Sequence, residues 1–312
     1  MPIDNEDSAV FASLESLVQD QYQARLLDAI KDSKTARTSN GVTRSIFKGR
    51  GMDFEEVRQY QDGDDVRLVD WRLTAKVGKV YTKMFNQEHD RNVWFLLDLR
   101  AGMKFGTQQA FKSVISAHIM AMLGWYFWKK ADKIGGYVLS EKNIMEFKPS
   151  RLRKKVMSFF SAVSENTRRQ AAPADVSDTN SLTQACMKLR SSCRNGNIIF
   201  IISDFYDVDE DAFKCLSSLS RTNEVIFINV YDVLECSCPP PNVYLVSDGN
   251  QHVVLDTRQQ EVQDIYAHHF FKRLYILRDF ALKYHIRYVP ISSDMGDYYS
   301  VVAKMMRRQT RG

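Results

Sequence analysis

Two aspartates directly follow two strongly apolar segments, and their side chains could hold a metal ion. Asp98 follows residues 93–97, and Asp204 follows residues 198–203. Near-continuous apolar runs of this length are typical of strands buried on both faces of a parallel sheet. Ligands of such sheets bind beyond the carboxyl ends of the strands, and Mg²⁺ prefers oxygen ligands. The pattern therefore permits a divalent-metal site at this edge of the sheet.

A second set of charged residues lies earlier in the chain. From residue 48 to residue 91 there are nine Lys/Arg and nine Asp/Glu, so this segment is charge-neutral. Such a balance favours an internal ion-pair network over a phosphate-binding patch. Trp71, between Asp70 and Arg72, is expected to bury its ring as a core anchor. The alternative is an interaction surface or a ligand site where this segment meets the following domain.

The spacing of these residues resembles the signature of a bacterial family called domain of unknown function fifty-eight. Its members carry a von Willebrand factor A-like (vWA) domain, and the resemblance extends from about residue 40 to the C-terminus. The signature reads Arg-x-Tyr-x-x-Gly-Asp-Asp-x-Arg-x-x-Asp-Trp. This chain supplies Arg58, Tyr60, Gly63, Asp64, Asp65, Arg67, Asp70 and Trp71.

The resemblance implies a particular metal site, which this chain matches only in part. The metal-ion-dependent adhesion site of vWA domains uses Asp-x-Ser-x-Ser after the first strand, a loop Thr and a later Asp. Asp98 and Asp204 match the two acids, and the loop position falls at Thr179 or Asn180.

The two serines of that site are replaced in this chain by Arg100 and Gly102. Glycine offers no side-chain ligand, and a guanidinium can neutralise carboxylates through paired hydrogen bonds. We therefore expect a degenerate site in which Arg100 replaces the ion and no cofactor is bound. A working Mg²⁺ site that bridges to a partner's carboxylate is the alternative.

The elements around these residues predict an α/β fold with a doubly wound, mostly parallel sheet. Apolar runs at 93–97, 198–202 and 225–230 predict buried strands. Helical patterns cover residues 107–130, 152–163, 182–194, 209–220 and 261–284, with Thr107 as the first N-cap. Residues 243–246 and 252–255 predict a β-hairpin before the last helix and strand (286–291), and a terminal helix follows. A helix at 8–31 and a strand at 79–85 predict a small N-terminal region, so the expected domains are 1–90 and 91–312.

Composition narrows the class of protein. The 312 residues are 44% hydrophobic and 12% aromatic, which predicts a globular core, and the net charge of +5 does not argue for nucleic acid. Five cysteines without paired metal-ligand spacing disfavour a disulfide framework and zinc. The first 20 residues lack a secretory pattern, and the apolar residues 117–128 are too few to span a bilayer. These features predict a cytoplasmic protein.

A basic stretch, residues 148–169, has seven Lys/Arg and one acid. We expect it to be a solvated helix face. The alternative is contact with an acidic partner or an anionic lipid surface, so membrane contact would be peripheral at most.

The expected function is non-enzymatic, because no nucleophile with a base and no phosphate-binding Gly loop accompanies the acids. The resemblance implies a protein-interaction module that works with MoxR-type AAA+ ATPases in assembling or maturing other proteins. The alternative is a metal-dependent hydrolase that uses the signature carboxylates. The expected partner-binding residues are Arg58, Asp64, Asp65, Arg67, Asp70, Trp71 and Arg100.

Overall fold

The computed structural model describes residues 5–35, 52–61, 66–87, 91–168, 180–247 and 252–308. The chain forms two compact units, one of residues 1–37 with 91–312 and one of residues 38–90. This grouping corrects the expected boundary, because the N-terminal helix belongs to the large unit. The reason is packing: Leu17 and Ala24 of that helix are buried in the same apolar core as the long central helix.

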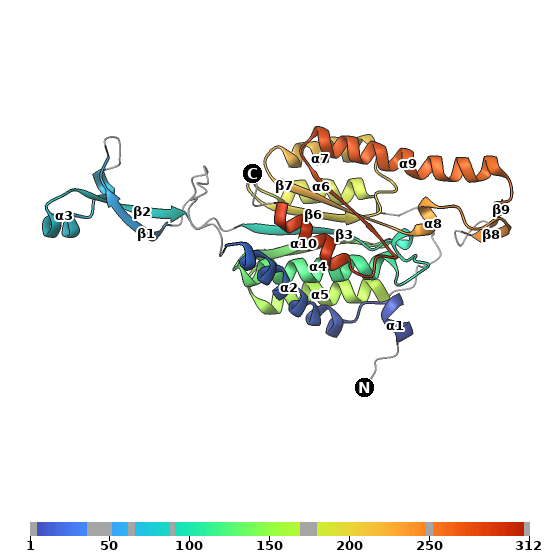
Figure 1. Ribbon diagram of the computed structural model, residues 1–312, viewed down its shortest axis with the longest axis horizontal. Helices are drawn as coiled ribbons and strands as arrows, with labels where there is room; N and C mark the ends of the chain where they lie inside the picture. Colours follow the sequence, from blue (N-terminus) through green and yellow to red (C-terminus); the bar gives the residue numbers. More distant parts are fainter. Residues whose placement is uncertain are drawn as a thin grey trace. The chain divides into compact units, whose positions relative to one another are not determined.

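The large unit is built on one six-stranded sheet, which confirms the expected doubly wound α/β fold (Figure 1). Every neighbouring pair of strands is parallel except the last, β4 with β5. In spatial order the strands are β10 (Arg287–Ser292), β7 (Glu224–Tyr231), β6 (Ile198–Ser203), β3 (Asn92–Asp98), β4 (Lys133–Leu139) and β5 (Ile144–Ser150).

Strand β4 was not predicted from the sequence, because Gly135 and Gly136 interrupt its apolar pattern. Both glycines are required by close approach of neighbouring strands. A Cβ on Gly136 would lie 2.1 Å from the carbonyl oxygen of Phe95, and one on Gly135 would lie 2.3 Å from that of Phe147. The two glycines that interrupt the apolar strand pattern in the sequence therefore allow β4 to pair with a strand on each side.

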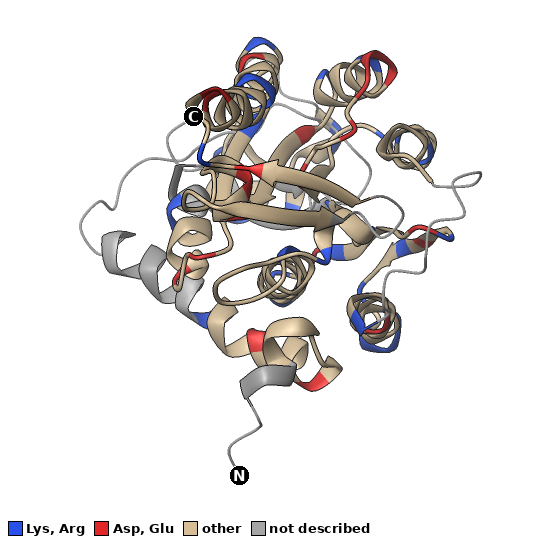
Figure 2. Ribbon diagram, turned by 90° about the vertical axis from the view of Figure 1, so that its right-hand side faces the viewer, with Lys and Arg blue, Asp and Glu red and all other residues tan. Residues whose placement is uncertain are grey.

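Helices cover both faces of the sheet, and Figure 2 shows several of them nearly end-on around the strands. Side chains alternate along each strand, so Phe95 packs into one core and its neighbours Trp94 and Leu96 into the other. The first core also contains residues of α2 (Leu14–Thr35), α4 (Lys112–Lys129), α5 (Arg153–Arg168) and α10 (Tyr298–Arg308). The second contains residues of α6 (Leu182–Ser192), α7 (Glu210–Ser220) and α9 (Gln260–Lys283).

Helix α4 is almost entirely buried, so the apolar run at residues 117–128 belongs to the protein core. The prediction that this helix begins at Thr107 is wrong. It begins at Lys112, since the side chain of Thr107 is engaged by Asp232. No helix within the described part of the chain is long and apolar enough to cross a membrane.

The predicted hairpin is confirmed as β8 (Val243–Ser247) paired antiparallel with β9 (His252–Asp256). It forms a sheet of its own and leads into α9. Several of its apolar side chains, including Leu245, are exposed.

The small unit contains an antiparallel pair, β1 (Met52–Gln59) and β2 (Tyr81–Gln87), so the strand expected at 79–85 is present. Between them lie a 3₁₀ turn, η1 (Val66–Leu68), and α3 (Trp71–Val77). Asp70 caps α3 by accepting the backbone N–H of Arg72 and Leu73, each at 3.1 Å. Gly78 ends the helix with a φ of 74°, a left-handed conformation that favours glycine.

The predicted burial of Trp71 is wrong. Its side chain is 63% exposed, at the first position of α3. The cap explains this, because Asp70 turns inward to the helix N-terminus and the next side chain starts the outer face of a short helix.

Candidate functional site

The carboxyl ends of the parallel strands bring polar side chains to one edge of the large unit. Asp98 ends β3, Asp204 follows β6, Asp232 follows β7 and Ser293 follows β10. All four residues are buried. We call the group formed by Asp98, Arg100, Lys112, Asp204, Asp207 and Glu235 the sheet-edge site.

Arg100 makes the contact that the sequence predicted with one of the two strand-end acids. Its Nε donates to Asp98 Oδ1 at 2.9 Å, and its Nη2 donates to Asp98 Oδ2 at 2.7 Å. The opposite side of the guanidinium binds Asp207, with Nη1 2.5 Å from Oδ2 and Nη2 2.8 Å from Oδ1. Arg100 therefore bridges two carboxylates that come from different loops.

The pKa values of the three groups in this bridge are set by burial and by the contacts between them. Burial raises the pKa of Asp98, while hydrogen bonds from Arg100 and from the Ser203 hydroxyl (2.8 Å) oppose that rise. Burial also works against ionisation of Asp207 and Arg100, but their mutual hydrogen bonds and charges prevail. The pKa of Asp207 is lowered and that of Arg100 is raised. The guanidinium therefore stays charged at any physiological pH.

The second acid, Asp204, is paired with a lysine and not with Arg100. The Nζ of Lys112 donates to Asp204 Oδ2 at 2.9 Å and to Glu235 Oε1 at 2.6 Å. Lys112 is 0% exposed. Burial would lower its pKa, but the charges of Asp204 and Glu235 outweigh burial, and the pKa is raised. The sheet-edge site thus contains a buried ammonium as well as the guanidinium.

Asp232 holds the segment before α4 in the position that aims Lys112 at Asp204. It accepts the backbone N–H of Thr107 at 2.9 Å and the Thr107 hydroxyl at 2.6 Å, and it also accepts the Ser293 hydroxyl. The same carboxylate caps the short helix α8 (Val233–Cys236), which carries Glu235. Burial acts to raise the pKa of Asp232, but the hydrogen bonds from Ser293 and Thr107 lower it.

These hydrogen bonds decide how well the site fits a divalent cation. All four carboxylate oxygens of Asp98 and Asp204 accept a protein N–H or O–H; the Oδ1 of Asp204 accepts the N–H of Tyr206 at 3.1 Å. Gly102 adds no ligand, although a Cβ there would lie 3.4 Å from Asp204 Oδ2. Within the described ranges, no group of three or more His, Cys, Asp or Glu is arranged to hold a metal ion. The residues present therefore do not fit Mg²⁺, since an ammonium and a guanidinium stand where the ion would bind.

The loop residue next to the site does not point at the acids. Asn180 donates through Nδ2 to the backbone carbonyl oxygens of Ser140 (3.4 Å) and Glu141 (3.1 Å). The backbone carbonyl oxygen of Asn180 accepts a hydrogen bond from Nη1 of Arg100 at 3.4 Å. Its role is to hold the loop in place. Thr179, the other predicted residue, lies outside the described residues.

The predicted partner-binding residues of the small unit lie in different structural environments. Asp70 is a helix cap, Trp71 and Arg67 are exposed, and Arg58 lies on β1. Asp64 and Asp65 lie outside the described residues.

Several residues of the site and of its immediate surroundings were missed by sequence reasoning. Asp232 carried a signal, because it follows a strand run just as Asp98 and Asp204 do. Lys112 carried none: it is one lysine ahead of an apolar helix whose start was placed five residues too early.

Tyr206 is also positioned by the fold. Phe205 adopts a φ of 52° and buries its ring against Phe227, with 4.9 Å between ring centroids. This turn leaves Tyr206 73% exposed between Asp204 and Asp207. The guanidinium of Arg273 lies 4.7 Å from the centroid of the Tyr206 ring.

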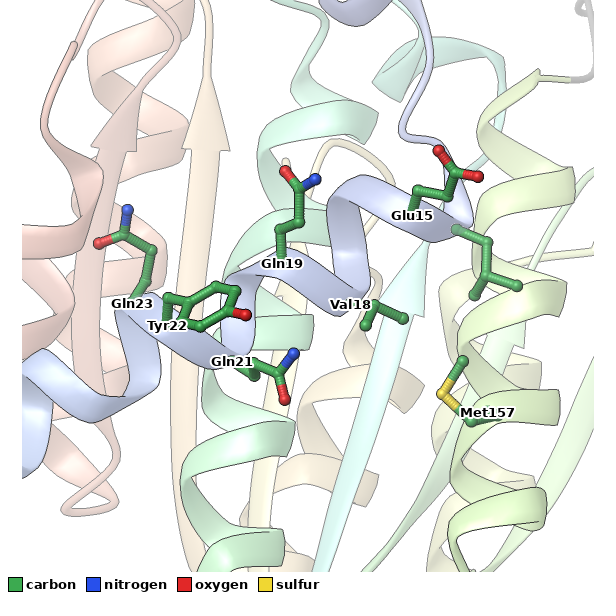
Figure 3. A pocket seen from close by; sticks show the side chains of 8 residues that line it. Glu15, Val18, Gln19, Gln21, Tyr22, Gln23 and Met157 are labelled. Carbon is green, nitrogen blue, oxygen red and sulfur yellow. The ribbon is translucent and has the colours of Figure 1, made fainter.

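An open hollow lies elsewhere, between α2 and α5 (Figure 3). Its lining includes one carboxylate and none of the residues of the sheet-edge site, so we assign it no chemistry. The lining residues are Leu14, Glu15, Val18, Gln19, Gln21, Tyr22, Gln23 and Met157.

Comparison with known proteins identifies relatives across most of the chain. The family model described as "Protein of unknown function DUF58" matches residues 56–273. Uncharacterized proteins of Mycobacterium tuberculosis (Rv1480) and Mycobacterium bovis (Mb1516) are each 23% identical over 230 residues, which is 74% of this chain and 71% of theirs.

Two solved structures are similar at low sequence identity. The conserved hypothetical protein BatB from Bacteroides thetaiotaomicron has a TM-score of 0.43 and 13% identity, and the match covers 71% of this chain and 100% of BatB. The VWA domain of SpRpn10 has a TM-score of 0.39 and 8% identity, covering 68% of this chain and 93% of that domain.

Proposed function

We propose that this chain, which belongs to the DUF58 family of proteins of unknown function, is a protein-interaction module. Its partner is a MoxR-type AAA+ ATPase, and together they assemble or mature other proteins. The module binds through the sheet edge and does so without a metal ion.

One observation carries the interaction role: the strand-end acids are neutralised by the chain's own cations. Arg100 and Lys112 take up the carboxylate oxygens that a hydrolytic metal or a general base would need. These oxygens already accept hydrogen bonds from the protein, so they are not free to bind a metal ion or to take a proton from a substrate. The arrangement is suited to holding loops in a fixed shape.

The surface beside this rigid network has the residue types that dominate protein interfaces. Tyr206 projects from the loop after β6 and has Arg273 against its ring. Tyr and Arg are enriched among residues that contribute most to binding energy. Loops at strand ends are also where α/β folds present binding surfaces.

The partner is tested by affinity capture with the full chain as bait in a lysate of the native cell, read by mass spectrometry. An AAA+ ATPase in the bound fraction supports the proposal, and its absence from repeated captures refutes the choice of partner. Binding of the purified ATPase then gives a dissociation constant in the presence of chelator, which tests independence from metal.

The location of the interface is tested with two matched variants. Tyr206→Ala should weaken binding about tenfold or more, because exposed anchors of this type are common hot spots. Leu152→Ala, at an exposed position before α5, is the control and should bind like the wild type.

A second test concerns the basic stretch on α5. Reversing the charges of Arg153, Lys154 and Lys155, which are all exposed, should leave binding unchanged. If that triple variant loses the partner while Tyr206→Ala retains it, the interface lies on α5 and the proposed location is wrong.

A further inference from the structure

Basic side chains gather at the amino edge of the central sheet, the edge opposite the sheet-edge site. Three segments meet there: residue 91, which precedes β3; residues 129–133, which lead from α4 into β4; and residues 151–155, which lead from β5 into α5. We call their basic residues the basic rim. They are Arg91, Lys129, Lys130, Lys133, Arg151, Arg153, Lys154 and Lys155.

Hydrogen bonds join the three segments to one another. The Nε of Arg151 donates to the carbonyl oxygen of Ala131, and the indole N–H of Trp128 donates to the carbonyl oxygen of Arg151 at 2.9 Å. The backbone N–H of Lys133 donates to the carbonyl oxygen of Arg91 at 3.1 Å. The fold therefore holds cations from separate parts of the chain side by side.

The rim has an excess of positive charge. Residues 129–133 and 151–155 contain seven Lys/Arg and one acid, Asp132. Burial raises the pKa of Asp132, and the charges of three nearby cations act against that rise. Those cations are Arg91, Lys130 and Arg151. One carboxylate is therefore shared by three cations, and the rim as a whole attracts anions.

An exposed apolar side chain lies among these cations. Residues 151–155 are all exposed, and Leu152 is 64% exposed. The three residues after it form no ion pair with an acid of the described part of the chain; they are Arg153, Lys154 and Lys155. They occupy the first turn of α5, which contains no acid. Positive charge in a first turn is opposed by the helix dipole, so these cations do not serve the stability of the helix.

We propose that the basic rim binds the surface of an anionic lipid membrane. Anionic headgroups attract Lys and Arg that come close to them, and an exposed Leu beside the cations inserts at the boundary of headgroups and acyl chains. Binding of this kind is peripheral and reversible. It is independent of the ATPase interface, because that interface lies at the carboxyl edge of the sheet.

The rim is less suited to nucleic acid, which would also match its charge. Phosphates attract the cations but give Leu152 no apolar surroundings. Single strands bind through exposed aromatic rings on which their bases stack. Trp128, the aromatic residue beside the rim, is partly buried against the first core, and its N–H is bound to Arg151.

The experiment is co-sedimentation of the full chain with vesicles made of equal parts phosphatidylglycerol and phosphatidylcholine. Vesicles of phosphatidylcholine alone are the comparison. The chain should bind the anionic vesicles and not the neutral ones. Raising the salt concentration from about 0.1 to 0.5 M should weaken binding, because salt screens exposed charges.

A triple variant tests the cations. Combining Arg153→Gln, Lys154→Gln and Lys155→Gln should lower the partition coefficient at least about tenfold, since each cation near an anionic surface contributes roughly fivefold. This variant should melt no lower than the wild type, because it removes charges that oppose the dipole of α5.

The matched control removes three exposed cations from α9, which packs against the opposite face of the sheet. It combines Lys272→Gln, Arg278→Gln and Lys283→Gln. The net charge of the control equals that of the α5 variant, so the control should bind vesicles like the wild type if the rim is the contact.

Leu152→Ala separates lipid from other polyanions. It should lower the partition coefficient at least about threefold, because less apolar surface enters the membrane. The proposal is overturned if the wild type does not bind anionic vesicles, if the α5 variant binds them like the wild type, or if the control loses as much binding. Vesicle binding that Leu152→Ala leaves unchanged also overturns it, and so does tighter binding of duplex DNA or polyglutamate than of the vesicles.

Discussion

Replacing Lys112 by Met removes the buried ammonium and leaves Asp204 and Glu235 facing each other without a cation. Met fills nearly the same volume, so the change tests charge and not packing. Removing one partner from a buried ion pair typically costs about 3–5 kcal/mol of unfolding free energy. Glu235 is partly exposed and can be rehydrated, so we expect the lower end, about 3 kcal/mol. For a unit of this size that corresponds to a melting temperature lower by about 5 °C.

The assay is thermal and urea unfolding of the wild type and Lys112→Met at several pH values. The orphaned carboxylates of the variant should have raised pKa values, and an acid with a raised folded-state pKa costs stability above its unfolded-state pKa. The deficit should therefore shrink as the pH falls from 8 towards 5.

The matched control is Lys214→Met, which also breaks a Lys–Asp pair with a separation of 2.8 Å but on the surface of α7. Exposed pairs contribute little to stability, so this variant should melt like the wild type. If Lys112→Met also melts like the wild type, or if its deficit is the same at every pH, the buried ammonium is not the counter-ion of the site.

Three further predictions concern metal, pH and the signature tryptophan. Millimolar Mg²⁺ or Mn²⁺ should leave the melting temperature of the wild type unchanged, whereas a micromolar site would add about 4 kcal/mol; a rise that chelator reverses would show an intact metal site. The pKa of Lys112 is raised above its ordinary 10.5, so its stabilisation is complete below pH 10.5 and is lost as the pH rises through the folded-state pKa. The urea midpoint should fall in that alkaline range, and Lys112→Met should lack this part of the fall. Trp71→Ala should change the unfolding free energy by less than about 0.5 kcal/mol, as for other exposed positions; a large loss of stability would mean that the ring is buried against another part of the protein.

Local patterns in the sequence were sufficient to predict most helices and strands of the large unit. The apolar runs that became β3, β6 and β7 and the hairpin β8–β9 could be identified because strand burial and turn chemistry depend on neighbouring residues. The strand β4 and the start of α4 could not. Gly136 is explained by a close approach to Phe95, and Thr107 is held by Asp232, 125 residues away.

The sequence by itself determined that two acids would stand at strand ends and that a guanidinium would be near them, since Asp98 and Arg100 are two residues apart. Which cation neutralises Asp204 was decided only by the tertiary structure. Lys112 reaches that acid because α4 packs beneath the sheet and Asp232 anchors the segment before it. The exposure of Trp71 was decided in the same way. Whether a side chain is covered depends on the packing of segments distant in sequence, and a periodic pattern gives only the face on which it lies.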